Sequence, residues 1–194
     1  MDGFELVVVA SSAGGVQALT TLVSELPADF GLAVVIVQHV DPRHRSLLVE
    51  ILARRSRLPV EPVEDGTKMV PGTIYVAPPG FHVLVEADHT LSLSHAELVN
   101  FVRPSADLLF ESAAASFTDR VIAVVLTGTG EDGAVGVRAV HEMGGTVVVQ
   151  DQGSSEFFGM PHAAINTGAV DFVLPLEEIA PALVTLSTSG QDER

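Results

Sequence analysis

Three polar side chains that follow apolar, valine-rich runs could together perform nucleophilic catalysis. Ser12 and His39 come after the first two of these runs, and Asp132 lies in a Gly-rich turn after a later one. In an open parallel sheet the carboxyl ends of the strands meet in one crevice, so residues placed in this way can converge there. Serine, histidine and aspartate are the members of a nucleophilic triad. These three residues are therefore the candidate catalytic residues.

Two other roles are open for Ser12. A serine before Gly14-Gly15 at the start of a helix is commonly an N-cap, and a Gly-rich turn after the first strand can also bind phosphate. The turn lacks both the G-x-G-x-x-G and the G-K-[ST] patterns of nucleotide-binding proteins. The second strand ends in Gln38 and His39 instead of the acidic residue that would hold a ribose.

The other two candidates also have alternatives. Asp132 could be the N-cap of a helix that begins at Ala134, and Glu131 is the competing carboxylate. His39 could be a histidine that is merely satisfied at a strand end, but the first two strands are expected to be neighbours, which favours a general base beside Ser12. The chain lacks G-x-S-x-G, and its order of serine, histidine and aspartate is not that of α/β-hydrolases, so a triad here would belong to another fold.

No metal site is predicted. The remaining histidines are scattered among loops and helices and show no H-E-x-x-H or comparable spacing. They are His44, His82, His89, His95, His141 and His162. The sequence contains no cysteine, which excludes disulfides and thiolate metal sites.

The composition is that of one folded, acidic domain. The 194 residues suffice for a substantial core, and 47% hydrophobic residues argue against disorder. Twenty-five acidic and ten basic residues leave a formal charge of −15, which repels nucleic acid and anionic membranes. The acidic N-terminus is unlike a secretory signal, and no run approaches the roughly 20 apolar residues that span a bilayer. We therefore expect a soluble, cytoplasmic protein that binds no nucleic acid and does not insert into membranes.

Valine- and isoleucine-rich runs alternate with helical patterns, which is the βαβ signature of a parallel sheet. The predicted strands are 6–10, 33–37, 60–63, 121–127, 146–150 and 169–174. The predicted helices are 15–26, 45–57, 105–117, 134–143, a short helix after Pro161, and 176–186. Between 65 and 93, three short segments at 73–77, 82–86 and 90–93 indicate a hairpin inserted beside this sheet.

The predicted fold class is therefore α/β, with a three-layer, doubly wound, mostly parallel, Rossmann-like sheet and a β-hairpin insertion. We divide the chain into a catalytic domain, residues 1–186, and a polar C-terminal tail, residues 187–194. No internal repeat and no linker long enough to divide the chain further is visible.

At these residues the chain resembles the catalytic domain of the chemotaxis protein-glutamate methylesterases, the CheB family. The family's G-A-S-T-G-G turn, Q-H-M-P strand end and L-T-G-M-G-x-D-G turn correspond to residues 10–15, 38–42 and 126–133. The likeness continues in shorter blocks, so that it covers about residues 5–179. These blocks are 64–66, 71–78, 103–110, 158–161 and 164–166.

The resemblance implies that Ser12 is the nucleophile, His39 the general base and Asp132 the orienting carboxylate. It implies hydrolysis of glutamate methyl esters on the cytoplasmic helical bundles of chemoreceptors, deamidation of receptor glutamines as in many members, and no metal or organic cofactor. We place candidate substrate or oxyanion contacts at six further positions. These are Ala13, Gly14, Gln38, Arg103, Thr129 and Met160.

The chain departs from the family in several places. Ala13 replaces a threonine, Thr129 replaces a methionine, and Asp41 precedes the proline of the strand end. The family's usual N-terminal receiver domain is not in this chain, so we expect a free-standing or excised catalytic domain that is active without phosphorylation, and control by a separate receiver in trans stays open. The alternative function is a catalytically decayed signalling or scaffold module of the same fold.

Overall fold

The structure is a computed structural model that describes residues 3–40 and 46–189. Its centre is a seven-stranded sheet in the order β10-β9-β8-β1-β2-β5-β3, with parallel pairing throughout. The strands are β1 (Leu6–Ser11), β2 (Ala33–Gln38), β3 (Val60–Pro62), β5 (Ile74–Val76), β8 (Val121–Val125), β9 (Thr146–Gln150) and β10 (Phe172–Leu174). The predicted α/β fold with a parallel sheet is confirmed.

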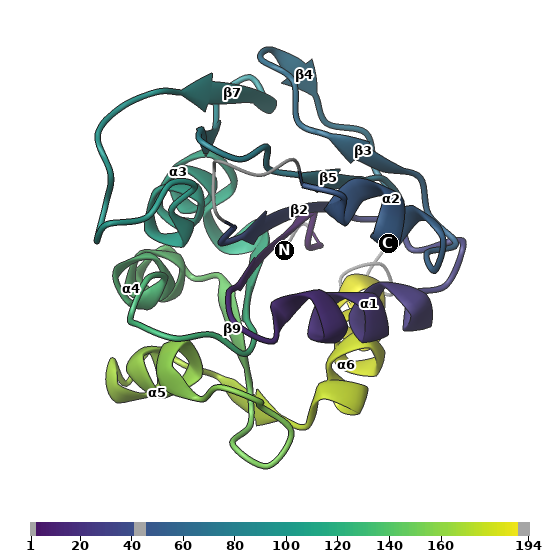
Figure 1. Cartoon of the computed structure of the whole chain (residues 1–194). Coiled ribbons are helices and arrows are strands. Elements are labelled where there is room, and N and C mark those ends of the chain that lie inside the picture. Colours follow the sequence, from purple (N-terminus) through teal and green to yellow (C-terminus); the bar gives the residue numbers. More distant parts are fainter. Residues whose placement is uncertain (1–2, 41–45, 190–194) are drawn as a thin grey trace.

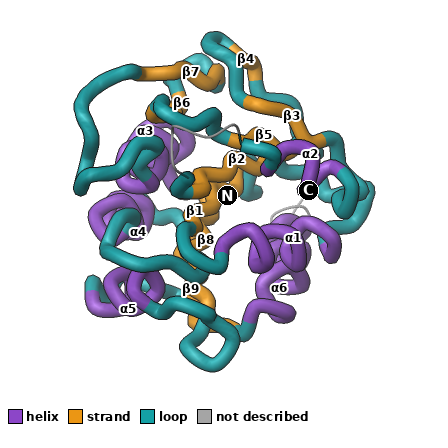
Figure 2. Tube along the Cα trace, viewed as in Figure 1, coloured by secondary structure: helices purple, strands orange, loops and turns teal. Residues whose placement is uncertain are grey.

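Helices cover both faces of this sheet (Figures 1 and 2). One layer consists of α1 (Gly15–Glu25), α2 (Leu48–Ala53) and α6 (Leu176–Ser189). The other layer consists of α3 (Ala106–Phe117), α4 (Ala134–Glu142) and α5 (Gly159–Asn166), and a single 3₁₀ turn (Thr118–Arg120) leads from α3 into β8. No helix in the described ranges is both long enough and apolar enough to cross a bilayer.

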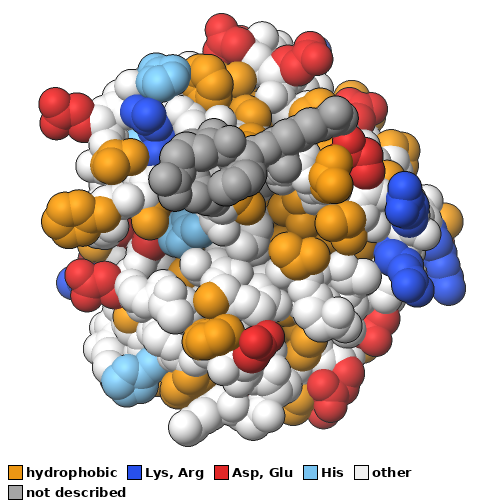
Figure 3. All heavy atoms as spheres, in the orientation of Figure 1, with side chains coloured by type: hydrophobic (Ala, Val, Ile, Leu, Met, Phe, Trp, Pro, Cys, Tyr) orange, Lys and Arg blue, Asp and Glu red, His pale blue; other side chains and the backbone are white. Residues whose placement is uncertain are grey.

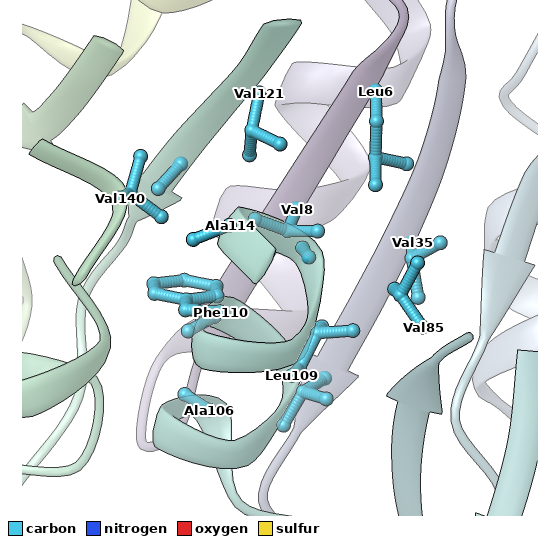
Figure 4. Close-up of a cluster of buried hydrophobic side chains, with 14 of the residues drawn as sticks. Leu6, Val8, Val35, Val85, Ala106, Leu109, Phe110, Ala114, Val121 and Val140 are labelled. Atoms are coloured by element: carbon cyan, nitrogen blue, oxygen red, sulfur yellow. The ribbon is translucent and has the colours of Figure 1, made fainter. Parts of the chain in front are cut away.

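Successive residues of the central strands bury their side chains in two different cores. In β1, Val8 packs in the core beneath α3, α4 and α5, whereas Val7 and Val9 pack in the core beneath α1, α2 and α6. Figure 4 shows Leu109 and Phe110 of α3 close to the sheet residues of the first core. Burial on both faces explains why the strands read as unbroken apolar runs.

The predicted hairpin insertion is present as a separate antiparallel sheet. It contains β4 (Thr67–Lys68), β6 (His82–Val85) and β7 (Thr90–Ser94) in the order β4-β7-β6. The prediction was wrong in one respect, because it grouped segment 73–77 with the hairpin. That segment forms β5 of the main sheet, between β2 and β3, where Ile74, Tyr75 and Val76 are all buried.

Several predicted boundaries shift. Helix α5 begins at Gly159, ahead of Pro161, because proline is tolerated in the first turn of a helix. The strand predicted at 169–174 is shorter at its start, and α6 continues to Ser189, beyond its predicted end and into the predicted tail. The predicted helix 45–57 corresponds to the shorter α2. Residue 45 of that prediction and the tail residues 190–194 lie outside the described residues.

Candidate active site

The sheet reverses its strand order at β1, which has β2 on one side and β8 on the other. Ligands of open α/β sheets bind at such a switch point, outside the carboxyl ends of the strands. Two backbone hydrogen bonds continue the pairing beyond the strands there. The N–H of His39 donates to the carbonyl oxygen of Ser11 (3.0 Å), and the N–H of Ser12 donates to that of Thr127 (3.1 Å). The turns that carry Ser12 and His39 are thereby fixed side by side.

His39 is hydrogen-bonded to Asp132 in this crevice. Its Nε2 lies 2.7 Å from Oδ2 of Asp132, and the two side chains are 12% and 3% exposed. Burial opposes ionisation of Asp132, but the hydrogen bonds from His39, from the N–H of Ala106 and from Ser105 outweigh it and hold the pKa below its usual value. An ionised carboxylate only accepts hydrogen bonds, so Nε2 carries the proton and Nδ1 is left as the basic nitrogen.

The carboxylate of Asp132 caps a helix, but not the helix that follows it. Its Oδ2 accepts from the N–H of Ala106 (2.6 Å), and its Oδ1 accepts from the N–H of Asp107 (3.2 Å) and the hydroxyl of Ser105 (2.8 Å). These donors form the N-terminus of α3. The N-cap residue of α4 is Gly133, which offers no side chain, so the predicted alternative for Asp132 was wrong.

Asp107 makes the reciprocal contact, because its carboxylate accepts hydrogen bonds from the start of α4. Its Oδ1 accepts from the N–H groups of Gly133 (2.9 Å) and Gly136 (2.8 Å), at the start of α4. Burial, together with the negative charge of Asp132, raises the pKa of Asp107 to about 6, although the N–H of Gly136 favours its charged form. The turn that bears Asp132 is therefore held at both ends by charge-assisted hydrogen bonds.

The hydroxyl of Ser12 does not serve as the cap of the helix that follows it. The N-cap residue of α1 is Gly14, at φ 75°, and no side chain caps this helix, so the N-cap alternative for Ser12 was wrong. Within residues 3–40 and 46–189 the hydroxyl makes no hydrogen bond. The backbone carbonyl oxygen of Ser12 accepts hydrogen bonds from the N–H of Gly15 and from Nε2 of Gln38, both at 2.8 Å. The backbone fixes the residue and leaves its side chain available.

Gln38 is the buried brace of this turn. Its Oε1 accepts from the hydroxyl of Ser11 (2.6 Å), and its Nε2 donates to the carbonyl oxygens of Ser12 (2.8 Å) and His39 (2.9 Å). A Cβ at Gly15 would collide with this amide, which explains the glycine. Gln38 was expected among the substrate or oxyanion contacts, but its amide is engaged within the fold.

The other predicted contacts lie in different places. Thr129 lines the open cleft, and the N–H groups of Ala13 and Thr129 donate no hydrogen bond within the described part of the chain. Met160, by contrast, is 1% exposed, so its side chain is packed inside. Arg103 lies at a smaller neighbouring pocket, and Gly14 borders a third one behind the turn.

An open cleft of about 780 Å³ lies against His39 and Asp132. Several of its lining residues were not predicted as contacts: Asn100, Phe101, Arg138, His162 and Asn166. Asn166 falls in a block of family resemblance, whereas Phe101 carries no sequence signal. The residues that the structure describes contain no group of three or more histidine and acidic side chains suited to a metal ion.

Comparisons with known proteins give consistent family and fold matches. The family model described as CheB methylesterase matches residues 7–183. A relative from Leptospira interrogans, "Putative protein-glutamate methylesterase/protein-glutamine glutaminase", is 41% identical over 98% of this chain and 99% of its own length. A protein-glutamate methylesterase/protein-glutamine glutaminase of Thermotoga maritima is 37% identical over 94% of this chain, which spans 54% of that relative. The crystal structure of the Thermotoga maritima CheB methylesterase catalytic domain superposes with a TM-score of 0.91 at 36% identity, covering 95% of this chain and 99% of that one.

Proposed function

The chain belongs to the CheB methylesterase family, and from this we propose that it hydrolyses glutamate methyl esters on chemoreceptors, with Ser12, His39 and Asp132 as a catalytic triad. The observation that carries the proposal is the hydrogen bond between His39 and the ionised Asp132. Backbone hydrogen bonds hold the turn of His39 beside that of Ser12, whose hydroxyl makes no hydrogen bond to the described residues. Acyl transfer to serine needs these three groups in these three roles.

The reaction proceeds in two steps. Nδ1 of His39 takes the hydroxyl proton as the oxygen of Ser12 attacks the ester carbonyl, and Asp132 stabilises the imidazolium through Nε2. The imidazolium then protonates the departing methoxide, and methanol leaves an acyl-enzyme. A water molecule, deprotonated by the same nitrogen, hydrolyses this ester and releases the glutamate carboxylate with the serine restored. The use of Nε2 for the carboxylate is the reverse of the chymotrypsin-type arrangement, in which the aspartate binds Nδ1.

The backbone N–H groups of Ala13 and Thr129 are our oxyanion donors. Thr129 lines the cleft, Ala13 follows Ser12 in its turn, and neither N–H group donates a hydrogen bond within the described part of the chain. Donors fixed in this way act on charge as it develops and need no reorganisation, which makes a good one worth about 3 to 4 kcal/mol of barrier. Because both groups belong to the main chain, the replacements of the family's threonine and methionine at these positions leave them in place.

We propose deamidation of receptor glutamines as a second activity of the same site. The relatives from Leptospira and Thermotoga are both named as glutaminases as well as methylesterases. An amide carbonyl has the shape of the ester carbonyl, and the leaving group becomes ammonia after protonation by the His39 imidazolium. Acidic groups in the cleft, among them Glu131, would repel the carboxylate product and so favour its release.

The test is release of labelled methanol from a chemoreceptor cytoplasmic fragment that carries methyl-labelled glutamates. We expect release by the protein and none above background by Ser12→Ala, with unchanged unfolding of the variant. Absence of release by the wild-type protein, despite binding to the fragment, would favour the decayed signalling module. Ammonia release from a glutamine-bearing fragment tests the second activity separately.

A further inference from the structure

A tight turn between β7 and α3 has a conformation that does not suit its sequence. Val99 and Val102 exchange two backbone hydrogen bonds with N to O distances of 3.1 and 2.9 Å, which makes Asn100 and Phe101 the central pair of a two-residue turn. Both residues have positive φ angles, 49° and 64°. Such turns favour asparagine followed by glycine, because a Cβ atom is disfavoured at positive φ. Phenylalanine in the second position therefore costs free energy that glycine would avoid.

The fold gains little from the Phe101 ring. Phe101 is 94% exposed, whereas the other exposed large hydrophobic residues in the described ranges are 37 to 55% exposed. Asn100 is different, because it tolerates positive φ and its Nδ2 donates to Oδ2 of Asp107 (3.3 Å). Strained backbone positions concentrate at functional sites, where the surroundings enforce them. A solvent-exposed aromatic ring at such a position points to binding as its role.

The segment that leads into the turn is fixed by side-chain hydrogen bonds. Nη1 of Arg103 donates to the carbonyl oxygen of Ala96 (2.7 Å) and, at 3.3 Å, to that of His95. Nε2 of the buried His82 bonds the carbonyl oxygen of Glu97 (2.9 Å). The ring is thus presented by a braced loop, and a preordered contact loses less entropy when a partner binds.

Phe101 stands between two hollows that share His39. It lines the cleft of about 780 Å³ at the candidate active site and also a pocket of about 180 Å³ beside it. Leu98 and Val102 line the smaller pocket too, and Leu98 is 55% exposed. We call Leu98, Phe101 and Val102 the apolar rim. Figure 3 shows hydrophobic side chains projecting from this side of the molecule, over the connection between β7 and α3.

We propose that the apolar rim, with Phe101 as its anchor, binds an apolar side chain of the substrate protein next to the esterified glutamate. This inference rests on the proposed function. The rim is continuous with the catalytic cleft through His39, so a polypeptide that delivers its ester there lies within reach of Phe101. With a formal charge of −15 the protein gains no long-range attraction to a glutamate-bearing partner, and apolar contact must supply the affinity.

The experiment compares two substrates for the variant Phe101→Gly. Glycine removes the ring and suits positive φ, so the variant should fold at least as stably as wild type. On the methyl-labelled receptor fragment we expect kcat/KM to fall about tenfold, mainly through KM, as for loss of an aromatic anchor. On N-acetylglutamate γ-methyl ester, which lacks the neighbouring apolar side chain that the rim would bind, the rate should change less than about twofold. If wild type and Phe101→Gly had equal kcat/KM on the fragment, or if the variant lost the same factor in kcat/KM on both substrates, the proposal would be overturned.

Two controls sharpen this test. Phe101→Leu keeps an apolar side chain and should retain most of the fragment affinity, while Phe172→Ala removes another exposed aromatic ring, on the edge strand β10, and should change neither substrate. The affinity of the fragment for Ser12→Ala, measured with and without Phe101→Gly, reports on the rim contact independently of hydrolysis. Weaker binding by the double variant supports the rim even if wild type releases no methanol, and unchanged binding refutes it.

Discussion

Asp107 and Asp132 cap each other's helices. Asp132, in the turn before α4, accepts from the N-terminal N–H groups of α3, and Asp107, in the first turn of α3, accepts from those of α4. Hydrogen bonds to charged groups contribute about 1.5 to 3 kcal/mol each, so this exchange locks the two helices in register. It also fixes the carboxylate that is hydrogen-bonded to His39, which ties the geometry of the candidate active site to the packing of α3 against α4.

The first prediction concerns the triad as a unit. Ser12→Ala and His39→Ala should each lower kcat by about 10⁴ to 10⁶, and the double variant should be little worse than either single one, because triad members are strongly non-additive. Single-turnover methanol release from the receptor fragment measures all three. Losses that simply multiply would mean that the two residues do not act together.

The second prediction separates the two neighbouring carboxylates. Asp132→Asn should lower kcat by about 10⁴, since an amide can hold the wrong histidine tautomer. Glu131→Gln is the matched control, because Glu131 is exposed and makes no side-chain hydrogen bond within the described residues, so its rate should stay within a few-fold of wild type. A larger defect in Glu131→Gln would transfer the orienting role to that residue.

The third prediction is a pH dependence of stability that comes from Asp107. Its pKa is raised from the ordinary 3.8 to about 6 in the folded protein, so the folded state binds this proton more tightly than the unfolded state. Its stabilising contribution is therefore complete below about pH 4 and is lost as pH rises through about 6. Asp132 contributes with the opposite sign, since its pKa is lowered and its contribution is lost as pH falls.

Asp107→Asn isolates the first of these effects. We compare the free energy of unfolding of wild type with that of the variant. The wild-type value minus the variant value should decrease by about 2 kcal/mol between pH 4 and pH 7. Urea titrations at four pH values measure this difference. Because Asp132 is present in both proteins, the pH dependence that Asp132 contributes largely cancels. Parallel stability curves for the two proteins would show that Asp107 keeps its ordinary pKa.

The fourth prediction tests the close approach of two turns. A Cβ added at Gly128 would lie 2.9 Å from Cβ of Ser12 and would also meet the sulfur of Met160. Met160 can yield, but Ser12 is held by its backbone, so Gly128→Ala should lower kcat by about 10- to 100-fold through displacement of the nucleophile. Gly31→Ala is the control, because nothing lies within 4 Å of a Cβ there, and it should leave the rate unchanged. The small ester suffices as substrate, and an unaffected Gly128→Ala would place Ser12 in a looser turn.

The parallel sheet and the placement of polar residues at its strand ends could be predicted from the sequence. Strands buried on both faces, such as β1 and β8, read as unbroken apolar runs, and chemistry at their carboxyl ends follows from the fold class. The position of β5 did not follow, because three apolar residues between prolines and glycines look the same in a hairpin and in a parallel sheet.

Contacts between distant elements were harder to foresee. That Asp132 caps α3 is decided by the packing of α3 beside α4, which no local pattern encodes. The amide of Gln38 looks like a possible substrate contact until its three partners are seen. The turn at Phe101 was missed for a different reason: its conformation calls for asparagine and glycine, and only the asparagine is there.

The central place of β1 has a consequence for synthesis of the protein on the ribosome. The strand that ends beside Ser12 is translated before β8, which completes one of its two hydrogen-bonding edges more than a hundred residues later. Until then one edge of this strand, which is apolar from Leu6 to Ala10, is unpaired in the nascent chain, and such an edge can pair with other chains. The same delay keeps Ser12 without Asp132, so under the proposed mechanism the nascent polypeptide lacks a complete triad until the middle of the sheet has closed.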